Sequence, residues 1–200
     1  MKRKLILVVV ALAAFPMIGM ALFTSMKDIR VGGKELQVLG SLPEFTLQER
    51  NGKSLSSKEL KGKVWVAGFI FTHCGGQCPL ISAQMERLQR KLHHRSQFRL
   101  VSFSVDPTRD TPKVLSAYAK KYSADDNQWL FLTGETETVN GLLRNGFHVG
   151  AELKDGDIIH SDKLVLIDSK GQIRGYYDGT DPAAVDALAA DAKHLIHNAG

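Results

Sequence analysis

Only two cysteines occur in the 200-residue chain, and both lie in the stretch F-I-F-T-H-C-G-G-Q-C-P-L. Cys74 and Cys78 follow an apolar run, and a proline comes directly after the second cysteine. A disulfide across so short a loop removes little entropy from the unfolded chain, which argues against a purely structural staple. Two thiolates at this spacing can instead exchange electrons with another dithiol or chelate a soft metal ion. The pair is therefore the candidate reactive centre.

The segments on either side predict that the pair lies between a strand and a helix. Residues 63–71 are nearly continuous in apolar side chains, as in a central strand covered on both faces. Apolar residues recur at helical spacing over residues 79–94, and Pro79 suits a first helical position. Backbone N–H groups and the macrodipole at a helix N-terminus favour thiolate over thiol. Gly75 and Gly76 leave the backbone between the cysteines free to adjust.

A metal site needs more than two thiolates, and the chain has seven histidines to supply another ligand. Copper(I) accepts low-coordinate thiolate and imidazole sites, whereas zinc prefers four ligands. Four histidines fall near expected helix ends and are interpreted as surface residues: His93, His94, His194 and His197.

Three other histidines are less easily assigned to the surface. His73 directly precedes Cys74, and in an extended segment its side chain points away from that cysteine, so it is a minor candidate. His148 lies in a glycine-flanked loop that gives no argument for its position. His160, in G-D-I-I-H-S-D, comes just before the strand expected at 164–168.

The rest of the chain from residue 44 alternates short apolar runs with helical patterns. Expected strands cover 45–48, 99–105 and 129–132, expected helices 111–122, 135–145 and 181–197, and an expected hairpin 164–168 and 172–177. Strands alternating with helices favour an α/β fold with a sheet covered by helices. The order strand, helix, strand, helix, hairpin, helix is that of a thioredoxin-like domain, with a central mixed β-sheet flanked by helices, and this identification rests partly on the family resemblance given below. In such a fold the segment that enters the strand at 164–168 lies against the cysteine loop, so His160 is the favoured third ligand.

A membrane anchor is predicted at the N-terminus. Three basic residues precede residues 5–23, which carry no charge and are close to the length that crosses a bilayer. No clear small-x-small cleavage site follows, so an uncleaved signal anchor is favoured over a removed signal peptide. The basic cluster is expected to stay cytoplasmic. The predicted organisation is therefore a transmembrane helix at 1–23, a linker at 24–43 and a domain at 44–200.

The net charge of +5 does not indicate a nucleic-acid partner. Five basic side chains and one acidic side chain fall in the first 30 residues, so the remaining chain carries only +1. Its basic residues form no stripe interleaved with aromatic residues, so the usual sequence signature of a nucleic-acid-binding protein is missing.

Four blocks of sequence resemble the SCO/SenC family of membrane-tethered, thioredoxin-like copper proteins that assemble cytochrome c oxidase. They are G-K-V-W-V-A-G-F-I-F-T-H-C-G-G-Q-C-P-L, S-V-D-P-T-R-D-T-P, W-L-F-L-T-G and H-S-D-K-L-V-L-I-D-S-K-G, in the family's order. The sequence departs from the family pattern in two places. Gly75-Gly76-Gln77 stand where proline or an acidic residue is common, and Ile159 stands where an acidic residue often precedes the histidine.

The resemblance implies that Cys74, Cys78 and His160 bind one copper ion, with the thiolates holding Cu(I) and the imidazole helping to admit Cu(II). It implies delivery of that ion to the dinuclear copper site of the copper-receiving subunit of a haem-copper oxidase. The expected location is the bacterial cytoplasmic membrane, crossed once, with the soluble domain on the periplasmic side. Asp106, in the Asp-Pro block, is interpreted as shaping a turn rather than supporting the metal ligands.

Two other functions remain open. A thiol–disulfide oxidoreductase that keeps the target's copper-site cysteines reduced would use Cys74 and Cys78 as its catalytic pair without requiring His160. The Cys-x-x-x-Cys spacing differs from the Cys-x-x-Cys of thioredoxin-type oxidoreductases and favours chelation. A peroxidase or redox sensor, in which one cysteine is oxidised first, is the third hypothesis.

Overall fold

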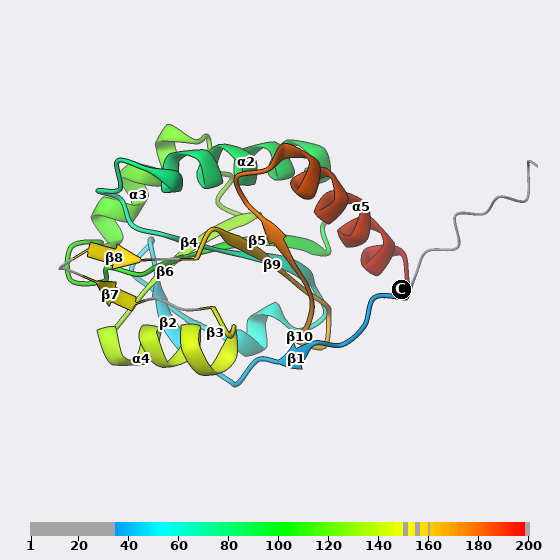
Figure 1. Ribbon diagram of the computed structural model, residues 1–200, viewed down its shortest axis with the longest axis horizontal. Helices are drawn as coiled ribbons and strands as arrows, with labels where there is room; N and C mark the ends of the chain where they lie inside the picture. The colour runs from blue at the N-terminus through cyan, green and yellow to red at the C-terminus, as the bar shows by residue number, and fades with distance from the viewer. Residues whose placement is uncertain (1–34, 150–151, 155–156, 160, 199–200) are drawn as a thin grey trace, which may run out of the picture. The chain divides into compact units, whose positions relative to one another are not determined.

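The computed structural model describes residues 35–149, 152–154, 157–159 and 161–198. Within these residues, eight strands form one mixed sheet in the order β1-β10-β9-β4-β5-β6-β2-β3 (Figure 1). Their bounds are β1 Gly40–Ser41, β2 Thr46–Glu49, β3 Ser54–Ser56, β4 Val64–Ile70, β5 Phe98–Ser104, β6 Trp129–Thr133, β9 Lys163–Ile167 and β10 Gln172–Asp178. Two short strands not expected from the sequence, β7 Glu152–Lys154 and β8 Asp157–Ile159, pair antiparallel in a second sheet.

Strand β4 occupies the middle of the large sheet. It runs parallel to β5, which is parallel to β6, and antiparallel to β9. Every residue of β4 is buried, which confirms that residues 63–71 contain a strand covered on both faces. Its side chains alternate between two apolar clusters, with Val66 and Ile70 in one and Trp65 and Phe69 in the other.

Helices cover both faces of the sheet (Figure 1). Helices α2 Gln77–Leu92, α3 Pro112–Lys121 and α5 Pro182–Asn198 contribute buried side chains to the cluster that contains Val66. The opposite cluster is covered by η1 Ser57–Leu60, α4 Thr136–Gly141 and the π-helical turn η2 Leu142–Gly146. The mixed sheet flanked by helices that the sequence predicted is therefore confirmed.

Two of the predicted helix starts are confirmed by their caps, and a third was wrong. The Thr111 hydroxyl accepts a hydrogen bond from Val114 N at 3.4 Å, and the Asp181 carboxylate accepts one from Ala183 N at 2.9 Å. Helix α2 begins at Gln77, two residues before the expected Pro79. Proline fits anywhere in the first turn because those N–H groups lack an intrahelical partner, so its presence does not fix the first residue. The earlier start places Cys78 inside the helix.

The folded domain begins earlier than residue 44. Strand β1 pairs antiparallel with β10, Leu39 N donates to Ile173 O at 2.8 Å, and Arg174 Nε donates to Leu36 O at 3.1 Å. The last part of the stretch expected to be linker, residues 24–43, thus adds an edge strand to the sheet. The described residues from 36 onward group as one compact unit.

The predicted transmembrane helix at residues 1–23 lies outside the described residues. Within the part of the chain that is described, no helix combines the length and apolar character needed to cross a membrane.

Candidate metal centre

The cysteine loop connects the carboxyl end of the central strand to the first turn of α2. After Ile70, the chain turns so that Cys74 N donates to Phe71 O at 3.2 Å. Gly76 is the N-terminal cap residue of α2, and its N–H donates to Cys74 Sγ at 3.4 Å. The predicted position of the cysteines, at the point where a buried strand gives way to a helix, is confirmed.

The two cysteines differ in burial. Cys78 is fully buried in the cluster beneath α2, whereas Cys74 is half-buried and packs against the same cluster. A side-chain hydrogen bond joins the two cysteines, and the backbone of Phe71 hydrogen-bonds to Cys78. The arrangement places two sulfurs close together with one of them accessible, which suits both metal chelation and dithiol exchange.

Burial disfavours the thiolate form of Cys78. Burial raises the pKa of Cys78 above its usual range, and this outweighs the lowering effect of the Phe71 backbone hydrogen bond. The neighbouring Cys74 and the negative charge of Asp110 raise that pKa further. The expectation that the helix terminus would favour thiolate was therefore wrong for Cys78, because the sequence did not show how deeply this side chain is buried.

The favoured third ligand, His160, lies outside the described residues. Among the residues that are described, no three His, Cys, Asp or Glu side chains gather as a metal site. The chain that follows His160 does come near α2, because Gly179 N donates to Asp162 O at 2.8 Å. A Cβ at Gly179 would also contact the Ile81 side chain, one turn beyond Cys78.

The other histidines, all of which the structure describes, do not gather around the cysteines. His73 is exposed, and its Nδ1 lies 3.1 Å from Thr72 Oγ1. His148 is exposed, adopts a positive φ of 53° and lies beside Gly40. The predicted surface positions are confirmed for His93, His94 and His197, while His194 is partly buried near the end of α5.

Asp106 organises the turn that follows β5. Its carboxylate accepts hydrogen bonds from Thr108 Oγ1 at 2.9 Å and from Arg109 Nε, and its backbone oxygen accepts from Arg109 N and Asp110 N. Its carboxylate and carbonyl contacts stay within residues 106–110, and its N–H donates to Ser104 Oγ at 3.1 Å, so its interpretation as a turn residue is confirmed.

Asp110, which sequence reasoning missed, is the carboxylate that reaches the cysteine loop. It is fully buried and accepts hydrogen bonds from Thr72 N, Thr72 Oγ1 and Ser104 Oγ. A signal was available, since Asp110 belongs to a block that follows one parallel strand while the cysteines follow its neighbour. Carboxyl ends of adjacent parallel strands meet at one edge of a sheet.

A family model described as SCO1/SenC matches residues 36–197. The chain belongs to the SCO1/SenC family. The resemblance seen in the four sequence blocks is therefore confirmed, and the match extends over nearly all of the folded unit.

Solved SCO1/SenC structures are similar to this chain over most of its length. A SCO1/SenC family lipoprotein from Bacillus anthracis is 34% identical, with a TM-score of 0.74, and the match covers 80% of this chain and 97% of that one. BsSco, described as having a disulfide switch and belonging to the Sco family of cytochrome c oxidase assembly proteins, is 33% identical, with a TM-score of 0.72 and coverage of 80% and 96%. ScoI from Bradyrhizobium japonicum, solved with copper bound, is 27% identical, with a TM-score of 0.64 and coverage of 78% and 99%.

Proposed function

We propose that this SCO1/SenC protein binds one copper ion through Cys74, Cys78 and His160 and delivers it to the dinuclear copper site of a haem-copper oxidase. The observation that carries the proposal is the adjacent pair of cysteines, with Cys74 on the loop that leads into α2 and Cys78 in the first turn of that helix. Two anionic sulfurs select a soft monovalent ion, and an imidazole nitrogen widens the site's tolerance to Cu(II). The Sco relative solved with copper bound supports the choice of metal.

The unequal burial of the two sulfurs suits a cargo site. Cys78 holds its ligand atom against the rigid core, and Cys74 is partly open on the loop. An accessible thiolate can be attacked by a ligand of the recipient while the buried one still holds the ion. Copper can then move by stepwise ligand exchange without being released into solution.

The full-length chain in detergent, reduced and kept without oxygen, provides the test. We expect one Cu(I) per chain when a competing chelator sets the free metal concentration. Cys74→Ser and Cys78→Ser should each weaken Cu(I) binding at least 100-fold, while His160→Ala should weaken Cu(II) binding more than Cu(I) binding. His148→Ala is the matched control, because His148 is exposed and lies beside Gly40. Unchanged Cu(I) affinity in Cys78→Ser would show that the copper site lies elsewhere.

A second function, thiol–disulfide exchange, is favoured by the contact between Cys74 and Cys78 and by the disulfide switch described for BsSco. The Cys74 thiolate would attack a disulfide of the target, which forms a mixed disulfide with one target sulfur and releases the other as a thiolate. Cys78 would then attack the Cys74 sulfur and release the remaining target sulfur. Two electrons and two protons pass to the target, and the pair ends as a disulfide that an external dithiol must reduce. His160→Ala should leave this exchange rate unchanged, which separates the two functions.

The proposal also includes the location. Residues 1–23 would anchor the chain in the bacterial cytoplasmic membrane, with residues 36–198 on the periplasmic side. The uncharged run at 5–23 after three basic residues supports this orientation. Protease added to spheroplasts should digest the domain. Protection of the domain until the cells are lysed would overturn the proposed orientation.

A further inference from the structure

Asp110 combines complete burial with a negative charge that no ion pair balances among the described residues. Its relative exposure is 0%, and within the described part of the chain no basic side chain lies within ion-pair distance of it. The neighbouring Arg109 pairs with Asp106 instead. A buried carboxylate is costly unless it is hydrogen-bonded, so its hydrogen bonds must compensate for lost hydration.

Those hydrogen bonds come from the ends of the two central strands. Ser104, the last residue of β5, donates its hydroxyl to Asp110 Oδ2 at 2.7 Å. Thr72, two residues after the end of β4, donates its hydroxyl to Asp110 Oδ1 at 2.6 Å and its N–H to Oδ2 at 3.1 Å. Hydrogen bonds to a charged acceptor are about twice as strong as neutral ones. The carboxylate therefore ties the start of the cysteine loop to the strand beside it.

We propose that Asp110 is a positioning residue for the metal site, acting through Thr72 to hold Cys74 where it can share a copper ion with Cys78; this rests on the proposed function. Thr72 stands two residues before Cys74, and its hydroxyl also contacts His73 Nδ1 at 3.1 Å. Cys78 needs no such hydrogen bonds to hold it in position, because it lies in helix α2 and is packed in the core. The loop cysteine is the ligand whose position depends on an outside support.

Partners that orient metal ligands commonly change metal affinity by 10- to 100-fold. The hydrogen bonds between Asp110 and Thr72 are a contact of this kind, because they hold the loop that carries Cys74 and do not touch the metal ligand itself.

The test uses the full-length chain in detergent and four variants. Asp110→Asn keeps the side-chain shape but removes the charge and one acceptor, and we expect about 10- to 100-fold weaker Cu(I) binding. Thr72→Val removes only the hydroxyl donor and should weaken Cu(I) binding about tenfold. Thr72→Ser restores the hydroxyl and should restore the affinity. Thr108→Val is the matched control, since Thr108 donates to Asp106 in the same turn but does not reach the loop.

A copper-free measurement separates this inference from the proposed function. Hydrogen–deuterium exchange of the Thr72 amide, followed by NMR, should be faster in Asp110→Asn than in the unsubstituted chain. Equal exchange rates would overturn the inference whether or not copper binds. It would also be overturned if the unsubstituted chain bound Cu(I) and both Asp110→Asn and Thr72→Val bound it within twofold. If the unsubstituted chain did not bind copper, only the proposed function would fail, and the exchange rates would decide the role of Asp110. Thr72 is only half-buried, so Thr72→Val keeps the test valid if Asp110→Asn fails to fold.

Discussion

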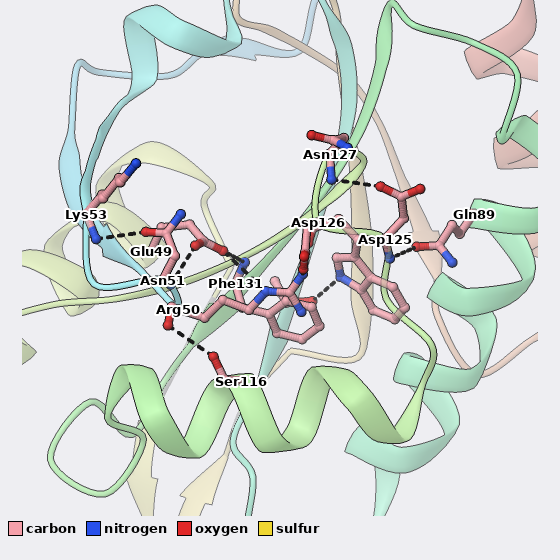
Figure 2. A network of polar contacts seen from close by, with 12 residues as sticks. Glu49, Arg50, Asn51, Lys53, Gln89, Ser116, Asp125, Asp126, Asn127 and Phe131 are labelled. Carbon is pink, nitrogen blue, oxygen red and sulfur yellow. Dashed lines mark hydrogen bonds and ion pairs between the residues drawn. The ribbon is translucent and has the colours of Figure 1, made fainter.

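Two buried polar networks lie at opposite ends of the parallel strands, and they balance charge in different ways. At the start of β6, Arg50 Nη2 donates to Asp126 Oδ1 at 2.7 Å and to Trp129 O at 3.3 Å, while Arg50 Nε lies 3.6 Å from Glu49 Oε1 (Figure 2). The guanidinium also stands 5.0 Å from the centre of the Phe131 ring. After the ends of β4 and β5, Asp110 is held by hydroxyl and amide donors only, among the residues described.

The difference indicates which network supports the fold and which supports chemistry. In the first network, Glu49 and Arg50 neutralise each other with side chains that are 6% and 8% exposed. Glu49 Oε2 accepts from Asn51 N at 2.8 Å, and Ser116 Oγ donates to Arg50 O at 3.1 Å. Such a network satisfies its own members and needs no ligand. The Asp110 network instead reaches the loop that carries Cys74, so it can act on the position of a candidate metal ligand.

Substitution of Arg50 should break the first network with the largest effect on stability. Arg50→Met keeps the stem that packs on Phe131 but leaves Glu49 buried without its cation. We expect the free energy of unfolding to fall by about 3 kcal/mol, because removing one partner of a buried ion pair leaves a charge uncompensated. Urea denaturation measures this change. Cu(I) affinity of the folded protein should stay within twofold, and a larger change would show that the two networks are coupled.

Much of the fold could be predicted because local patterns and tertiary packing agree. The apolar run of residues 63–71 can form a strand only if both faces of that strand are covered, and β4 is buried in this way. Thr111 and Asp181 each cap a helix by accepting a hydrogen bond from an N–H two or three residues later in the sequence. Such short-range signals do not depend on which strand is a neighbour. Strand β1 was missed because a two-residue edge strand has no periodicity, and only its partner β10 stabilises it.

The candidate site was less predictable because its chemistry depends on burial and on contacts far apart in sequence. The spacing of Cys74 and Cys78 identified the reactive pair, but the raised pKa of Cys78 arises from packing of α2 on the sheet. Asp110 lies 38 residues from Thr72 in the sequence, and the sequence of the turn does not show which of its aspartates reaches the cysteine loop. His160 stays a prediction, since it lies outside the described residues.

Copper binding should depend on pH because Cys78 must lose a proton to become a ligand. Burial raises the pKa of this thiol, so at neutral pH the metal-free protein holds the proton and binding releases it. The apparent Cu(I) affinity should therefore increase at least tenfold for each pH unit between pH 6 and 8, with about 1.4 kcal/mol per unit from the Cys78 proton alone. Titrations in buffers of different ionisation enthalpy measure the released protons.

The pH dependence of Cu(I) affinity also tests whether the Arg50 network is independent of the cysteines. Arg50→Met should keep the same slope, because the described contacts of its network do not reach the cysteines. A pH-independent affinity in the unsubstituted chain would mean that Cys78 is already a thiolate before copper arrives, and burial would then not control its charge.

Asp126 offers the smallest effect and the strictest test of which contacts matter in the Arg50 network. Its side chain is 92% exposed, although its carboxylate lies only 2.7 Å from Arg50 Nη2. Exposed ion pairs contribute about 0.2–1 kcal/mol and are screened by salt, so Asp126→Asn should lower the free energy of unfolding by about 0.5 kcal/mol, and by less in 1 M NaCl. Arg50 would keep its contacts with Glu49, the Trp129 carbonyl and the Phe131 ring. A loss near that of Arg50→Met would mean that the exposed carboxylate, rather than the buried one, compensates the guanidinium, and the two ends of the strands would then differ less than their burial indicates.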